Sequence, residues 1–189
     1  MSKTLSKSRR KARHVLSVRA GNLLQGAGFG LGCVSLWFST QPNSVPIRVM
    51  AMIGGYLLIY FTSHSSVHYL VGRLGGIMFS HYSVGGSSHA SSYPPVMRQI
   101  FERLPFLKVH TNPQSLVSAD ATAQALMFGA GILSTVLLSS LAALFAFRAD
   151  VPGSLSLLIF NVIWQVSSLI VEMRQGGDLA KAARAFRSS

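Results

Sequence analysis

Four long apolar segments limit what this chain can fold into. They cover residues 22–38, 47–75, 119–147 and 152–172, and the first is the shortest and the richest in glycine. A helix needs about 20 mostly apolar residues to cross a bilayer. Charged residues make up only 12% of the chain, about half the share usual in soluble domains. The sequence therefore predicts an all-α integral membrane protein with four transmembrane helices.

The positive charges predict the direction of these helices. Lys and Arg concentrate in the N-terminal tail, in the link after the second segment and in the C-terminal tail. The two short connections carry one arginine each, Arg48 and Arg148. Because positive residues favour the cytoplasmic side, both termini and the long link between helices 2 and 3 should be cytoplasmic. The organisation expected is a basic tail (1–20), a membrane domain (21–173) and a second basic tail (174–189).

Composition also bears on location and partners. The net charge of +12 could indicate nucleic acid, but the apolar segments make the lipid bilayer the expected partner and exclude nucleic acid. Another membrane protein or a membrane-segment ligand is a second expected partner. The expected location is a bacterial-type inner membrane. A mitochondrial membrane is the alternative, because the tail is rich in Arg, Lys and Ser and no acid precedes Glu102.

Two segments outside the spans have amphipathic patterns. In the long link, roughly 76–116, apolar residues at Val96, Ile100 and Leu104 predict a short surface helix. The C-terminal stretch from Asp178 predicts another helix or, alternatively, a frayed tail. Its apolar side would hold Leu179, Ala182, Ala183 and Phe186, and its basic residues Lys181, Arg184 and Arg187 could touch anionic headgroups.

Glycines recur every second residue in the first span, at Gly26, Gly28, Gly30 and Gly32. They form two overlapping G-x-x-x-G pairs, and such pairs let helices approach closely. The pattern is compatible with dimerisation or with packing inside the four-helix bundle, and we expect packing inside the bundle.

Two histidines near the end of the second span are candidates for chemistry. His64 and His68 are four residues apart, which places both on one helical face, one turn apart. Two such imidazoles can ligate one metal ion, as in H-x-x-x-H zinc helices. The alternative is that they only pack and hydrogen-bond with neighbouring groups. His81 follows the helix closely and is a further candidate ligand.

The segment "HSSVHYLVGRLGGI", followed by Gly85-Gly86, resembles the active helix of site-2 proteases, which are intramembrane zinc metalloproteases. The resemblance covers residues 60–122. It implies that His64 and His68 are zinc ligands. The third ligand of that family is an aspartate in an N-x-x-P-x-x-x-L-D-G pattern, and Asp120 is matched to it. Asp120 starts the third span on the predicted cytoplasmic side, where the two histidines also lie.

This chain departs from the family at the most diagnostic position. The family has a glutamate after its first histidine, and here Ser65 stands there. That carboxylate moves protons during peptide hydrolysis, and serine cannot replace it. We therefore expect a metal-binding, non-proteolytic or altered-activity relative, a pseudoenzyme with no assigned catalytic residue. The alternative is a small structural or interaction subunit of a membrane complex with no metal.

Overall fold

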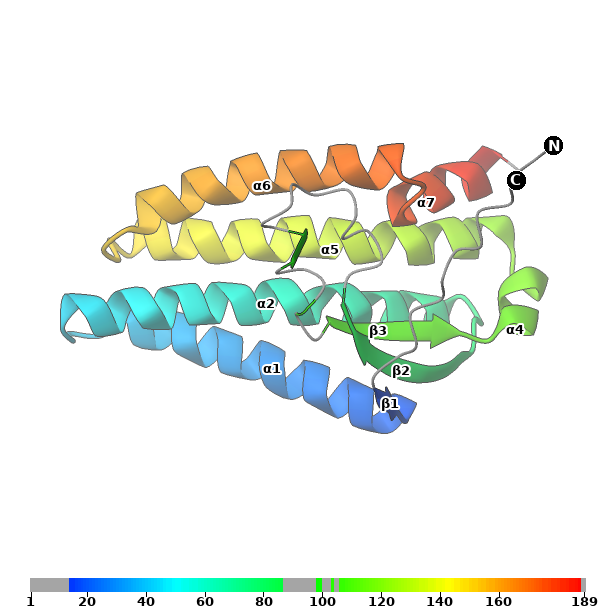
Figure 1. Cartoon of the computed structure of the whole chain (residues 1–189), viewed down its shortest axis with the longest axis horizontal. Coiled ribbons are helices and arrows are strands. Elements are labelled where there is room, and N and C mark those ends of the chain that lie inside the picture. Colours follow the sequence, from blue (N-terminus) through cyan, green and yellow to red (C-terminus); the bar gives the residue numbers. More distant parts are fainter. Residues whose placement is uncertain (1–13, 87–97, 100–102, 104–105, 188–189) are drawn as a thin grey trace.

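The computed structural model describes residues 14–86, 98–99, 103 and 106–187. Four long helices dominate the described part: α1 (Val18–Ser39), α2 (Val45–Leu74), α5 (Ala121–Arg148) and α6 (Ser154–Arg174). They lie side by side in the order α1, α2, α5, α6 (Figure 1). Their positions agree with the four predicted apolar segments. Of these, α2, α5 and α6 are long and apolar enough to cross a membrane, so the prediction of four spans is supported for three helices.

Local signals explain where the helices begin and turn. Ser17 caps α1 by accepting a hydrogen bond from the Ala20 backbone N–H at 3.2 Å, as N-terminal caps do. Between α5 and α6 the backbone reverses through Gly153, whose φ of +81° suits a residue without a Cβ. The polar side chain of Asp120 caps α5 in the same way as Ser17 caps α1.

The polarity of α6 is inverted relative to a helix of a soluble protein. Its inward face buries mainly polar residues, and its outward face exposes large apolar ones. A surface helix of a soluble protein has the opposite arrangement. The buried polar residues are Ser154, Asn161, Gln165 and Ser168, and exposed apolar residues include Leu155, Ile159, Ile163 and Val166. Such an arrangement is what a lipid-facing helix needs.

Side-chain hydrogen bonds attach α6 to its neighbours. The Tyr56 hydroxyl of α2 donates to Asn161 Oδ1 at 2.9 Å, and Asn161 Nδ2 donates to Ser140 Oγ of α5 at 3.0 Å. Gln165 Nε2 donates to Ser139 Oγ at 2.5 Å. Polar contacts of this kind help to hold helices together in a membrane, because apolar side chains gain little when they leave lipid for a helix interface.

The glycines of α1 divide into two sets. A Cβ on Gly28 would lie 2.6 Å from Thr62 Cγ2, and one on Gly32 would lie 2.9 Å from Ile59 Cγ1, so both glycines let α1 approach α2. Gly26 and Gly30 have no such neighbour. Packing inside the bundle is therefore confirmed for one of the two predicted pairs.

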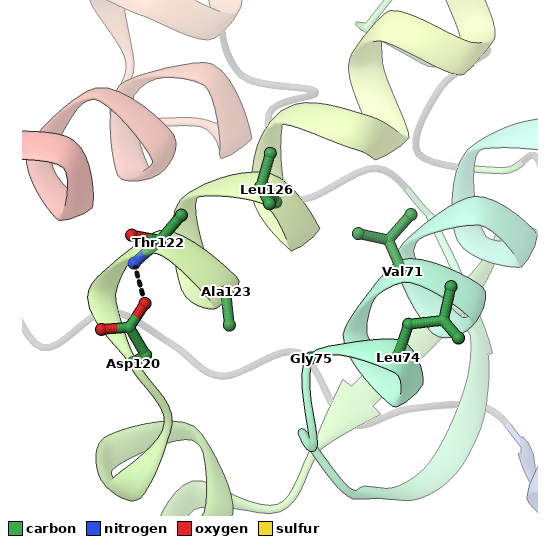
Figure 2. A pocket seen from close by; sticks show the side chains of 7 residues that line it. All are labelled: Val71, Leu74, Gly75, Asp120, Thr122, Ala123 and Leu126. Carbon is green, nitrogen blue, oxygen red and sulfur yellow. Dashed lines mark hydrogen bonds between the residues drawn. The ribbon is translucent and has the colours of Figure 1, made fainter.

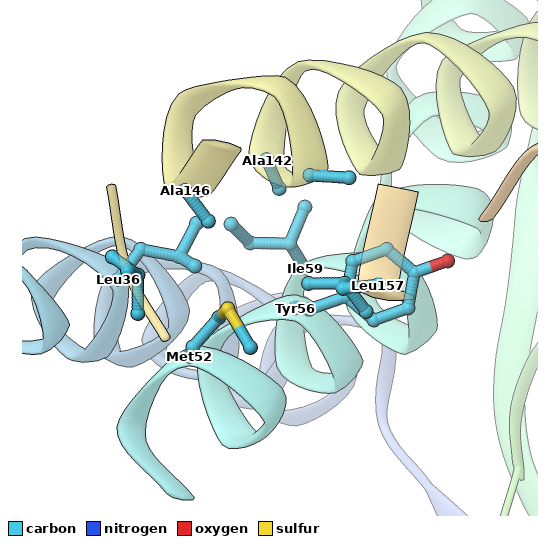
Figure 3. Close-up of a cluster of buried hydrophobic side chains, with 9 residues drawn as sticks. Leu36, Met52, Tyr56, Ile59, Ala142, Ala146 and Leu157 are labelled. Atoms are coloured by element: carbon cyan, nitrogen blue, oxygen red, sulfur yellow. The ribbon is translucent and has the colours of Figure 1, made fainter. Parts of the chain in front are cut away.

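An apolar cluster closes the end of the bundle where α1 ends and α2 begins (Figure 3). Met52 and Ile59 of α2 meet small residues of α5 there, and Ala143 and Ala146 are fully buried. The histidines lie in the opposite half of α2.

A small sheet corrects the all-α prediction. Three antiparallel strands form it in the order β1 (His14–Leu16), β2 (Phe79–Gly85) and β3 (Phe106–Thr111), and a short helix, α4 (Pro113–Ser118), follows β3. Tyr82 of β2 is fully buried, and its hydroxyl donates to Asn22 Oδ1 of α1 at 2.7 Å. The strands were missed because they are short and mix apolar and polar residues inside a basic link. The surface helix predicted around 96–104 falls mostly outside the described residues.

The predicted C-terminal helix is confirmed as α7 (Asp178–Arg187). It packs against α5 and α6 at the same end of the bundle as the last turns of α2 (Figure 1). Ala182 is its one buried residue. The tail predicted at 174–189 is thus largely part of the folded structure.

Candidate metal centre

His64 and His68 lie on the face of α2 that meets α5. His68 is buried, and its Nδ1 lies 2.7 Å from the carbonyl oxygen of Met127. His64 is half-buried, and its Nδ1 lies 3.2 Å from Thr135 Oγ1. The two rings meet edge to face, with centroids 4.6 Å apart. The predicted sharing of one helical face is therefore confirmed.

These partners fix which ring nitrogen carries the proton in each neutral imidazole. A carbonyl oxygen only accepts, so His68 Nδ1 must donate to Met127. The Thr135 hydroxyl donates its own hydrogen to the carbonyl of Gly131 at 3.0 Å, so it accepts from His64 Nδ1. Both Nε2 atoms are left with a free lone pair. Orientation of ligand histidines by such contacts is usual in metal sites.

Asp178 of α7 completes the group. Its Oδ2 lies 3.0 Å from His68 Nε2 and 3.4 Å from His64 Nε2, and the two Nε2 atoms are 3.1 Å apart. Donor atoms bound tetrahedrally at zinc distances are about 3.3–3.4 Å from one another. The three residues could therefore hold a metal ion.

The charges of the group favour a cation among these atoms. Two lone pairs and a carboxylate oxygen converge, so either a metal ion or a proton on one imidazole must separate them. Burial alone would raise the pKa of Asp178, but hydrogen bonds with His64 and His68 and the charge of Lys181 outweigh it and hold the pKa well below its usual range. Lys181 Nζ lies 2.6 Å from the other carboxylate oxygen, Oδ1. Asp178 is therefore ionised and could serve as an anionic ligand.

The position of Asp178 depends on the turn between α6 and α7. Gly176 has a φ of +69°, which a residue with a Cβ rarely adopts. Glu172 of α6 accepts a hydrogen bond from the Asp178 backbone N–H at 2.6 Å. This bond fixes the first residue of α7 beside the histidines.

Gly131 of α5 leaves room for the imidazole of His68. A Cβ at this position would overlap the ring, with Nε2 its nearest atom. Only glycine therefore allows α5 to pass this close to the imidazole of His68.

Asp120, the third ligand expected from the resemblance, is not part of this group. Its Oδ2 accepts a hydrogen bond from the Thr122 backbone N–H at 2.9 Å and caps α5. It also lines a mostly apolar pocket between the end of α2 and the start of α5 (Figure 2), together with Val71, Leu74, Gly75, Thr122, Ala123 and Leu126. The start of the third span is therefore a capping position, and α7 supplies the carboxylate.

His81, the further candidate ligand, belongs to the sheet. It pairs with His110 across β2 and β3, and the rings stack with centroids 4.5 Å apart. His81 Nδ1 faces Ser80 Oγ at 2.9 Å, and His110 Nε2 faces Ser83 Oγ at 2.7 Å. Burial, followed by the charges of His81 and Lys108, lowers the pKa of His110. Neither ring is part of the group formed with Asp178.

Ser65, which stands in place of the family's glutamate, points to a different partner. Its side chain is buried, and its hydroxyl donates to the carbonyl of Leu107 on β3 at 2.7 Å. The residue therefore joins α2 to the sheet.

Asp178 is the member of the candidate site that sequence reasoning missed. The chain has only five acidic residues, and Asp178 follows the fourth apolar segment after a glycine pair. The predicted topology was the available signal. It places the end of the fourth span, and Asp178 after it, on the same side of the membrane as the histidines at the end of the second span. No protein-family model, curated protein or solved structure matches this chain.

Proposed function

We propose that this chain is an integral membrane protein with a zinc centre at His64, His68 and Asp178. We propose further that it is a metal-binding, non-proteolytic or altered-activity relative of the site-2 proteases. The observation that carries the proposal is the convergence of two free Nε2 lone pairs and one carboxylate oxygen within 3.4 Å of one another.

The donor set favours zinc. Two imidazoles and one carboxylate leave one position open, as in catalytic zinc sites. Bound zinc would act there as a Lewis acid towards an oxygen atom of water or substrate. The same set suits ferrous iron, so metal analysis must report both elements. The protein's own part is to orient the two rings through Met127 and Thr135 and to keep Asp178 ionised.

Ordinary peptide hydrolysis does not follow from this centre. Ser65 has no carboxylate, and its hydroxyl is engaged with Leu107. The carboxylate of Glu172 accepts a hydrogen bond from the Asp178 backbone N–H through Oε2, so its role in these contacts is to position Asp178. A protein that binds a membrane-segment ligand without routinely cleaving it fits these contacts better.

A metal-free interaction subunit is the second candidate function. The observation that favours it is the contact between His68 and Asp178, which an imidazolium and a carboxylate can make without a metal. The histidines would then stabilise the packing of α2, α5 and α7.

The membrane arrangement is also part of the proposal. We place α1 in the membrane beside the three more apolar helices, with both termini and the sheet on the cytoplasmic side, as the positive charges indicate. A bacterial-type inner membrane is proposed, with a mitochondrial membrane as the alternative.

The metal content of the detergent-purified protein tests the proposal. The native chain should carry about one zinc ion, and a His64→Ala/His68→Ala variant should carry none. The thermal stability of the native protein should fall when a chelator removes the metal. Absence of zinc and iron from the native chain, with no effect of added zinc on its stability, would instead support the metal-free subunit.

A further inference from the structure

Basic and hydroxyl side chains gather on one face of the small sheet. In the ladder between β2 and β3, His81 is opposite His110 and Ser83 is opposite Lys108. Opposite residues of an antiparallel pair project from the same face, and so do residues two apart along one strand. These four residues, which we call the sheet cluster, are therefore neighbours although they come from two separate segments of the chain.

Hydrogen bonds and ring stacking hold the sheet cluster together. His110 Nε2 lies 2.7 Å from Ser83 Oγ, and the ammonium of Lys108 donates to the carbonyl oxygen of Gly86 at 2.6 Å. The imidazoles of His81 and His110 stack with an interplanar angle of 12°. The in-plane lone pairs of two parallel rings do not converge on one point, as the ligands of one metal ion must. The sheet cluster therefore lacks the geometry of a second metal centre.

The positive charge of the sheet cluster has no counter-ion within the described part of the chain. Every ion pair between described residues involves Asp178, at the metal centre. Burial lowers the pKa of Lys108, and burial followed by the charges of His81 and Lys108 lowers the pKa of His110. A carboxylate beside these groups would shift both pKa values in the opposite direction. An anion from outside the chain would therefore stabilise the charged forms of the cluster.

An external anion can reach these groups. His110 is exposed, and His81 and Lys108 are half-buried. An ammonium has three N–H donors, of which Lys108 uses one on Gly86, and an imidazolium has two. The hydroxyl of Ser83 can donate as well. Several charged donors on one surface match the oxygens of a phosphate group, which accept charge-assisted hydrogen bonds.

We propose that the sheet cluster binds a phosphate group through His81, Lys108 and His110, with Ser83 as a further hydrogen-bonding partner. The proposal does not rest on the zinc centre, because the two sites share no residue. The phosphate could belong to a soluble phosphomonoester or to the headgroup of an anionic lipid, since both present the same oxygens.

The expected effects follow from the charges. Loss of one charged partner should weaken phosphate binding by about tenfold to 100-fold, so this is the effect expected of Lys108→Met. Without phosphate, Lys108→Met should be at least as stable as the native chain, because it removes a partly buried charge that has no counter-ion. His110→Gln should weaken binding more at about pH 6 than at about pH 8, because the imidazolium of the native chain forms only at the lower pH.

The test is thermal unfolding of the full-length protein in phosphatidylcholine nanodiscs, in phosphate and in chloride buffers of equal ionic strength, so that general screening is the same. Phosphate should raise the melting temperature of the native chain and saturate, and Lys108→Met should lose most of this gain. Arg73→Gln is the matched control, because it removes an exposed positive charge from the last turn of α2, outside the sheet. It should respond like the native chain.

Two further arms separate the possible sources of the effect. The His64→Ala/His68→Ala variant should still respond to phosphate, which excludes phosphate bound to zinc as the cause. Nanodiscs that contain phosphatidic acid, with no added phosphate, test the lipid source. A gain that is larger in the native chain than in Lys108→Met indicates a headgroup ligand, and a gain with free phosphate alone indicates a soluble one.

An equal response to phosphate in the native chain and in Lys108→Met would overturn the proposed site. Loss of the response in Arg73→Gln to the same extent would also overturn it, since net charge would then explain the effect. A lower melting temperature of Lys108→Met in chloride, with a native response to phosphate, would assign Lys108 to the packing of the sheet. None of these results would affect the zinc centre, and absence of zinc would not affect the phosphate site.

Discussion

The substitution Gly131→Ala tests whether the imidazole of His68 lies against α5 as described. In an ordinary helix interior, Gly→Ala stabilises by up to about 1 kcal/mol. Here the new Cβ would overlap the ring of His68. The ring must move and lose its 2.7 Å hydrogen bond to Met127, or α5 must move away. Overpacking of this kind typically costs about 1–3 kcal/mol, which reverses the sign expected from helix propensity.

The substitution should reduce the affinity for metal more than it reduces the stability of the fold. Displacing His68 would remove one of the three proposed ligands, and loss of a mere orienting contact already costs about 10–100-fold in metal affinity. We therefore expect Gly131→Ala to weaken zinc binding by at least about 100-fold, equivalent to about 2.7 kcal/mol. The assays are chelator competition for affinity and thermal unfolding of the metal-free protein for stability.

Gly129→Ala is the control on the same helix. Its Cβ would meet only Ala182 Cβ, at 3.9 Å, an ordinary contact. This variant should bind zinc like the native chain and be as stable or slightly more stable. If Gly131→Ala behaved like Gly129→Ala in both assays, the placement of His68 against α5 would be refuted.

Further predictions concern the residue that replaces the family's glutamate, the contacts of α6 and the sheet. Ser65→Glu should not create protease activity, and should lower the melting temperature, because the new side chain would face the carbonyl of Leu107; cleavage of a model membrane peptide is the readout. Asn161→Leu should destabilise the protein by about 1–2 kcal/mol in a denaturation assay, because the Tyr56 hydroxyl loses its acceptor. The lowered pKa of His110 means that the unfolded chain binds the proton more readily, so protection of the sheet in hydrogen exchange should fall as pH drops below about 6.5. His110→Gln should remove that dependence.

The long helices could be predicted from the sequence because each apolar segment is a local signal. The four predicted segments and the four long helices agree within a few residues. The small sheet could not be predicted in this way. Tyr82 and Val84 of β2 alternate with polar residues over only a few positions, and their pairing with β3 depends on contacts across more than twenty residues.

In the candidate site, too, the part that depends on local spacing could be predicted and the part that depends on distant contacts could not. The pairing of His64 with His68 follows from helical spacing and is seen in the structure. The third candidate ligand depends on which helix end lies opposite α2, and the spacing of residues along the sequence does not predict that. Asp120 was matched to the aspartate of the family's motif, yet its carboxylate is engaged in capping α5. Asp178 reaches the histidines from more than a hundred residues away, through a turn at Gly176 that has no motif.

The most direct test of the metal centre is the zinc content of two single variants, Asp178→Asn and Asp120→Asn, beside that of the native chain. Each change removes one carboxylate charge, so the two variants are matched. We expect about one zinc per chain in the native protein and in Asp120→Asn, and little or none in Asp178→Asn. Zinc that persists in Asp178→Asn but disappears in Asp120→Asn would contradict the proposed ligand set and would restore the one that the family resemblance implies.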